Sequence, residues 1–374
     1  MLFPIHPDTP QCKVFEILNT EVLHFLEKSI NAKRFNQSLF TSFSDGLIIK
    51  KSACWTNKLT KEKFKGLWNV LPKTIPERQA IYQQIFNAQD VCSFFNDTNL
   101  ALPLFTQEVH DALKNLTAYL YIKTKDLADI KKQAGESIEE HYQNFIMLNS
   151  ELCWICGTAQ LSQNRTDIRV FDQWRADYDH ILCKDTYPAY TVHPANFIPT
   201  CHICNSKAKG AKNLLVCPET LNRRKAFYPL VPLRNSCCTF IKTQIILGQD
   251  LNDSMVNIRL AFAKMTPNIE NKIQIWDGVY QISARVTCHL TTHFYEKVDS
   301  QLRANDFNDF QAQLERHSRL PSDCRKSEWS FWWFRLYEFL KDQDNDFLLK
   351  IWNFLEWKKK RHQQEEVLSS VFHF

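Results

Sequence analysis

The sequence predicts an α+β protein in which a small cysteine-rich module lies between two larger regions. Apolar residues recur at helical spacing through residues 1–148. Two Cys-x-x-Cys pairs follow within residues 149–232, where short mixed stretches and turn residues replace the helical pattern. Residues 233–374 begin with strand-like alternation and then return to helical spacing. We therefore expect a mainly helical N-terminal region, a central module, and a C-terminal region of short strands followed by aromatic-rich helices.

The N-terminal region, residues 1–148, carries two helix signals. The segment Thr74-Ile75-Pro76-Glu77 has the form of a capping box, in which the threonine and glutamate side chains bond each other's backbone N–H groups. Further along, four apolar residues step by three and four positions, as they do on one face of a helix: Val109, Leu113, Leu116 and Leu120. An α-helical layer is expected here.

The C-terminal region combines two patterns. Segments 240–245 and 256–260 alternate apolar and polar residues, which suits strands of a small half-buried sheet. Helical spacing returns from Ile273 onward and includes an aromatic stretch over 329–339. Four residues form a stripe in and beside this stretch: Trp329, Trp332, Trp333 and Tyr337. We expect the stripe to belong to the core or to a subunit contact, with base stacking as the alternative.

Composition limits the class of protein. A chain of 374 residues with 44% hydrophobic residues can bury a core. The formal charge of +5 is modest, so an anionic partner would be met by a local patch. The most apolar segment, 329–340, is too short to span a bilayer, and the N-terminus lacks the order of a signal peptide. We expect a cytoplasmic protein that does not enter a membrane. The chain has seven glycines and neither a GxxxxGKS/T nor a GxGxxG element, so it carries no nucleotide-binding signature.

Two of the cysteine pairs have the spacing of metal ligands. Cys153, Cys156, Cys201 and Cys204 can supply four thiolates to one tetrahedral Zn²⁺, which leaves no open position for a substrate. Such an ion would be structural and would stabilise a small module by on the order of 10 kcal/mol. The alternatives are ordinary reduced thiols or a redox pair.

Polar residues lie between and just after these pairs. They are Asp179-His180, then Asn196 in the segment Asn-Phe-Ile, then Asn205 directly after Cys204. The order Asp-His, Asn-Phe-Ile and Cys-x-x-Cys-Asn-x-x-x-Lys-Gly resembles the HNH, or ββα-metal, endonuclease family over residues 150–212. This resemblance implies that the central module is a zinc-stapled ββα unit.

The resemblance and the chemistry of phosphodiester hydrolysis suggest a role for each residue. Asp179 and Asn205 offer a carboxylate and an amide oxygen, which suit a catalytic Mg²⁺ or Mn²⁺. His180, on the other side of its strand, would act as the general base that takes a proton from the attacking water. By the resemblance, Asn196 bonds the backbone across the loop and fixes the orientation of the histidine.

Four lysines flank the motif: Lys184, Lys207, Lys209 and Lys212. Their ammonium groups can hold backbone phosphates without reading bases. A solvated surface without a binding role explains any one of them equally well.

The sequence thus predicts a metal-dependent endonuclease that acts on DNA. A more distant resemblance, to HNH effectors of bacterial antiphage defence, implies an ATPase or another regulatory protein as partner. Two alternatives stay open. The chain can be a non-catalytic zinc module that binds nucleic acid or protein. It can also be a ribonuclease, because the predicted centre binds a phosphate rather than a base.

Overall fold

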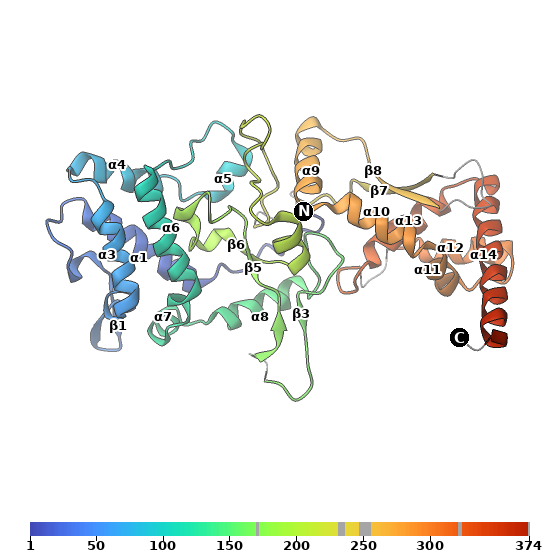
Figure 1. Cartoon of the computed structure of the whole chain (residues 1–374), viewed down its shortest axis with the longest axis horizontal. Helices are drawn as coiled ribbons and strands as arrows, with labels where there is room; N and C mark the ends of the chain where they lie inside the picture. Colours follow the sequence, from blue (N-terminus) through green and yellow to red (C-terminus); the bar gives the residue numbers. More distant parts are fainter. Residues whose placement is uncertain (170–171, 231–235, 247–255, 321–323, 373–374) are drawn as a thin grey trace.

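The computed structural model describes residues 1–169, 172–230, 236–246, 256–320 and 324–372. It is mixed α+β, as the sequence predicted: helices predominate, and the strands in these ranges form two-stranded sheets. The molecule is elongated, with the N-terminal helices at one end, the cysteine-rich module in the middle and the C-terminal helices at the other end (Figure 1). One cluster of buried apolar side chains draws on all three regions.

The N-terminal region is mainly helical. Its elements are α1 (Lys13–Ser29), η1 (Gln37–Leu39), β1 (Ser42–Asp45), β2 (Ile48–Lys51), α2 (Ala53–Thr56), α3 (Lys58–Val70), α4 (Ile75–Phe86), α5 (Val91–Asn96), α6 (Gln107–Ile122), η2 (Thr124–Asp126), α7 (Ala128–Ala134) and α8 (Ile138–Asn149). Helix α6 buries the four apolar residues that predicted it, Val109, Leu113, Leu116 and Leu120. The hydrophobic face read from the sequence is therefore confirmed.

The capping box predicted at Thr74 does not form, and the sequence analysis missed a capping box at the start of helix α8. Helix α4 begins after Thr74 as expected, but the Thr74 hydroxyl donates to the Glu77 carboxylate and does not cap the backbone. Helix α8 has the full motif. There Ser137 Oγ accepts from the Glu140 N–H at 3.1 Å, and the Glu140 carboxylate accepts from the Ser137 N–H at 2.6 Å.

The central module contains short elements joined by turns: β3 (Ser162–Gln163), β4 (Trp174–Arg175), β5 (Tyr178–His180), η4 (Pro188–Tyr190), η5 (Pro194–Asn196), β6 (Phe197–Pro199) and η6 (Ile203–Lys209). Strands β5 and β6 are antiparallel, with His180 opposite Phe197. The segment η6 is a π-helix, a wider turn than the α-helix. The chain therefore runs strand, strand, helical turn along the predicted motif.

The C-terminal region begins with a strand pair and continues with helices: β7 (Ile241–Ile246), β8 (Asn257–Phe262), α9 (Pro267–Tyr280), α10 (Ile282–Thr292), α11 (Phe294–Leu302), α12 (Phe307–His317), α13 (Ser330–Lys341) and α14 (Asn345–Phe372). Strand β7 alternates buried and exposed residues, as expected. Helix α13 buries Trp332, Trp333 and Tyr337, so the core interpretation of the aromatic stripe is confirmed for these three residues.

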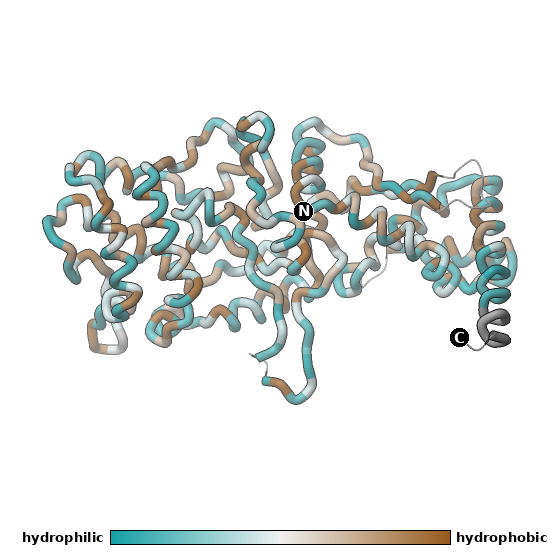
Figure 2. The backbone as a smooth tube through the Cα atoms, viewed as in Figure 1, coloured by the Kyte–Doolittle hydropathy of each residue, from teal (hydrophilic) through white to brown (hydrophobic). Residues whose placement is uncertain are grey.

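Hydrophobic and hydrophilic residues alternate along the helices rather than forming long apolar runs (Figure 2). Within the described ranges, no helix has both the length and the apolar character needed to cross a bilayer.

Candidate metal centre and adjoining cavity

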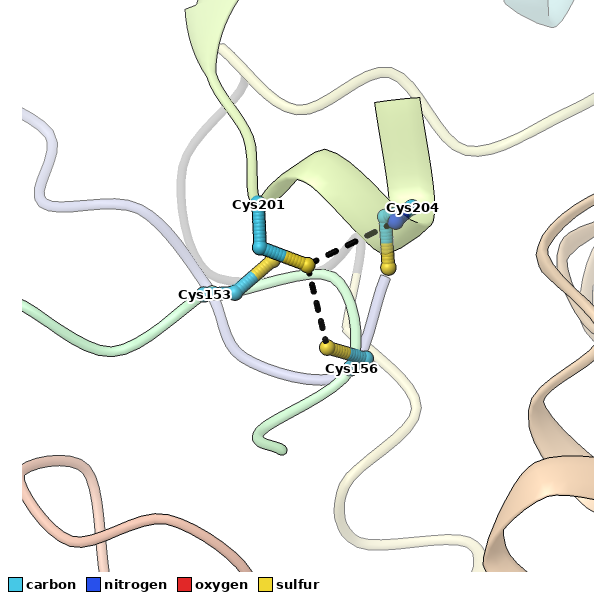
Figure 3. Close-up of side chains that lie close together, drawn as sticks. All are labelled: Cys153, Cys156, Cys201 and Cys204. Atoms are coloured by element: carbon cyan, nitrogen blue, oxygen red, sulfur yellow. Dashed lines mark hydrogen bonds between the residues drawn. The ribbon is translucent and has the colours of Figure 1, made fainter. Parts of the chain in front are cut away.

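Four cysteine side chains converge in the middle of the molecule. The Sγ atoms of Cys153, Cys156, Cys201 and Cys204 lie within 4.8 Å of one another, and all four residues are buried. Figure 3 shows two of them on the loop after α8 and two where η6 begins. Cys156 Sγ and Cys201 Sγ are 3.9 Å apart. Because a Zn–S bond is about 2.3 Å, a tetrahedral zinc would space its sulfurs by about 3.8 Å. The cluster could therefore bind a metal such as zinc.

The loop that carries the first cysteine pair is held from both ends of the chain. Gly157 has a φ of +65°, and an added Cβ there would lie 2.7 Å from the Leu2 side chain. Trp276 of α9 and Trp332 of α13 donate their indole N–H groups to carbonyls of this loop at 3.1 and 2.8 Å. The loop conformation thus depends on packing by distant segments as well as on its own sequence.

A cation lies beside the thiolates. Arg285 of α10 donates to Cys204 Sγ at 3.4 Å and to Thr158 Oγ1 at 3.1 Å, and Thr158 donates to Cys156 Sγ at 3.2 Å. Burial alone raises the pKa of Cys156, but hydrogen bonds from the other three cysteines and Thr158 outweigh it and lower the pKa well below its usual value. Burial raises the pKa of Cys153 and Cys204. Arg285 would offset part of the negative charge if all four cysteines bound a metal as thiolates. The sequence analysis missed this residue.

Three of the predicted catalytic residues line one cavity next to this cluster. Asp179 and His180 lie at the end of β5, and Asn205 lies in η6. The cavity has a volume of about 390 Å³. Its other lining residues include Tyr121, Asp177, Lys184, Asp185 and Ser206. The fold therefore brings together residues that are up to 26 positions apart in the sequence.

Asn196 lies behind the cavity and is fully buried. Its Oδ1 accepts from the Leu182 N–H at 2.7 Å, and its Nδ2 donates to the carbonyls of Leu182 and Tyr190 at 3.1 and 2.9 Å. These three bonds tie η5, which precedes β6, to the part of the chain that follows His180. Asn196 thus holds the backbone around the histidine.

His180 is buried, with 9% of its surface exposed. Its Nε2 is 3.2 Å from the Thr191 carbonyl oxygen. A carbonyl only accepts, so Nε2 carries the hydrogen and Nδ1 is left with the free lone pair. The ring packs edge-on against Tyr121 and Phe197. Burial, and then the charges of Lys184 and Lys209, lower the pKa of His180 to about 3, so the imidazole is neutral at physiological pH.

Asp179 forms a buried ion pair. Lys209 Nζ lies 2.8 Å from Asp179 Oδ1 and 2.7 Å from the His180 carbonyl oxygen, and both side chains are almost wholly buried. Within the described ranges, Asp179 Oδ2 is buried without a hydrogen-bond partner. Burial raises the pKa of Asp179, and Lys209 opposes that rise.

The expectation that Lys209 is a surface lysine able to hold phosphates is wrong. The π-helical turn, closed by a bond of 2.8 Å from the Gly210 N–H to the Asn205 carbonyl, brings Lys209 back toward β5. Lys184, Lys207 and Lys212 are exposed and keep that possibility.

No protein-family model, no curated protein and no solved structure matches this chain.

Proposed function

We propose that the chain is a metal-dependent endonuclease of the HNH type that hydrolyses phosphodiester bonds in DNA. The observation that carries this proposal is the convergence of Asp179, His180 and Asn205 on one cavity beside a four-cysteine cluster. The element order β5, β6, η6 is the order that a ββα unit requires. A nuclease of this kind needs a base for water and a cation for the phosphate, and the cavity offers side chains for both.

The cysteine cluster would act as a structural zinc site that sets the geometry of the cavity. Cys201 follows β6, and its carbonyl accepts from the Asn205 N–H at 2.9 Å. An ion bound by the four thiolates would fix the start of η6 against β6, and with it Asn205. Loss of this zinc should therefore unfold the module or separate Asn205 from Asp179.

Asp179 and Asn205 would hold the catalytic Mg²⁺ or Mn²⁺. The donor set fits such an ion, since Asp179 Oδ2 is a buried carboxylate oxygen without a hydrogen-bond partner among the described residues. When bound, the ion would neutralise charge on the phosphate and on the departing oxygen. Lys209 shares the same carboxylate and neutralises it while the cation is absent.

His180 would accept the proton of the attacking water at Nδ1, while its Nε2 remains bonded to the Thr191 carbonyl. A phosphate anion in the cavity would raise the pKa of His180, because a nearby negative charge favours the imidazolium form. Lys184, exposed at the edge of the cavity, would contact a flanking phosphate.

A regulatory protein, with an ATPase as the leading candidate, would restrain the enzyme in a bacterial antiphage role. This part of the proposal rests on the sequence resemblance alone.

The buried Asp179–Lys209 pair favours one second candidate. A carboxylate that is already neutralised by a lysine suits a non-catalytic zinc module that binds nucleic acid or protein. In that case the ion pair would serve only to stabilise the fold.

One experiment separates these functions. Purified protein is incubated with supercoiled plasmid, linear DNA and structured RNA, each with Mg²⁺ or with EDTA, and an Asp179→Ala variant serves as control. We expect Mg²⁺-dependent cleavage of DNA by the wild type only. Cleavage of RNA alone would assign a ribonuclease, and no cleavage of any substrate would support the non-catalytic module.

A further inference from the structure

A second cavity lies in the C-terminal region, away from the cysteine cluster. It is formed by α11, α12, α13 and the segment before α13, and its volume is about 540 Å³. Figure 1 places these helices toward the opposite end of the molecule from α1 and α3. Its lining residues include Lys297, Arg316, Arg319, Glu328, Trp333 and Tyr337.

Three cationic side chains line this cavity. Lys297, Arg316 and Arg319 line it, and within the described ranges none of the three is ion-paired with a carboxylate. Glu328 is the one carboxylate among the described lining residues, and it accepts a hydrogen bond from the Gln160 N–H at 2.8 Å. Three cations around one hollow create a local positive potential, although the chain as a whole has a charge of only +5.

Two histidines lie in or near this cavity, and burial is the main cause that lowers the pKa of each. Burial, and then Arg316, lower the pKa of His317, which also lines the cavity. Burial, and then His293 and Lys297, lower the pKa of nearby His289 to about 4. Both imidazoles are thus neutral at physiological pH, so the arginines and the lysine supply the charge.

Two aromatic side chains of α13 form part of the cavity wall. Trp333 and Tyr337 of α13 are nearly fully buried, and the Tyr337 hydroxyl donates to Gln301 Oε1 at 2.6 Å. Trp332, the residue before Trp333 on the same helix, donates its indole N–H to the Cys156 carbonyl at 2.8 Å. Helix α13 therefore joins this wall of the cavity to the loop that carries Cys156.

We propose that this cavity binds the phosphate groups of a nucleotide. Guanidinium groups match phosphate oxygens in geometry and charge, which favours Arg316 and Arg319 as the main contacts and Lys297 as a third. The volume of about 540 Å³ falls in the range of small-ligand sites. The site uses side-chain cations in place of a glycine-rich loop, which the sequence lacks. It goes beyond the proposed nuclease activity and does not depend on it.

The test is calorimetric titration of the full chain, without Mg²⁺, with two probes. ATP represents a free nucleotide, and a short single-stranded oligonucleotide represents a nucleotide within a strand. The double variant Arg316→Glu/Arg319→Glu reverses two exposed charges, and Lys350→Glu reverses an exposed charge on α14, outside the cavity. Zinc content and thermal unfolding of each variant report whether it is folded.

We expect at least one probe to bind to the wild type and to Lys350→Glu alike, and the double variant to bind it about tenfold more weakly or not at all. The probe that binds more tightly identifies the source of the nucleotide. The proposal is overturned if neither probe binds at millimolar concentration, or if the folded double variant binds with wild-type affinity.

Discussion

Replacing Lys209 by methionine tests the buried ion pair at the centre of the proposed site. The change removes the ammonium group but keeps most of the side-chain volume. In the wild type, Lys209 Nζ bonds Asp179 Oδ1 at 2.8 Å and the His180 carbonyl at 2.7 Å, with 1% and 3% of the lysine and aspartate side chains exposed. Removing one partner leaves a buried carboxylate without its counter-charge, which typically costs about 3–5 kcal/mol. We expect a loss of this size in the free energy of unfolding at pH 8.

The assay is urea unfolding of wild type, Lys209→Met, Asp179→Asn and the double variant, with zinc retained and without added Mg²⁺. The double variant should be more stable than Lys209→Met, because it leaves no buried charge unpaired. Adding Mg²⁺ should stabilise Lys209→Met more than the wild type, since the ion would then compensate Asp179 in place of the ammonium group. A loss below about 1 kcal/mol in Lys209→Met would refute the reasoning, because exposed ion pairs have that value.

Two further predictions concern zinc and pH. Cys201→Ser should lose its zinc by elemental analysis, whereas Cys54→Ser, which alters an equally buried thiol outside the cluster, should keep it; equal loss in both would argue against a four-cysteine site. Burial lowers the pKa of His193 to about 4, so the folded state favours the neutral ring. The free energy of unfolding should therefore have its full value above about pH 6.5, the pKa of an exposed histidine, and should decrease as the pH falls toward 4. At pH 5 the free energy of unfolding should be about 2 kcal/mol lower, and His193→Asn should not show this decrease. If the free energy of unfolding has the same pH dependence in both proteins, the assignment to His193 is wrong.

Local patterns predicted the elements that local chemistry decides. The four-residue spacing of Leu116 and Leu120 predicted the buried face of α6, and the alternation of apolar and polar residues from Ile241 predicted β7. The two Cys-x-x-Cys pairs form the four-cysteine cluster that their spacing predicted, because this spacing is typical of zinc ligands.

Contacts between distant segments could not be predicted in this way. Arg285 reaches Cys204 from 81 positions away, and nothing in its own helix distinguishes it from a surface arginine. The residues next to Lys209 in the sequence are typical of an exposed lysine. Its ion pair with Asp179 depends on the π-helical turn, which the sequence did not predict. The cavity at Arg316 depends on the packing of three helices and has no sequence motif.

The most direct test of the proposed function is the rate of plasmid cleavage by His180→Ala with Mg²⁺. If His180 is the general base, the rate should fall by about two to four orders of magnitude, while the variant remains folded at the assay temperature and keeps its zinc and its nucleic-acid binding. Wild-type cleavage by His180→Ala, under conditions in which Asp179→Ala is inactive, would contradict the assignment of the base.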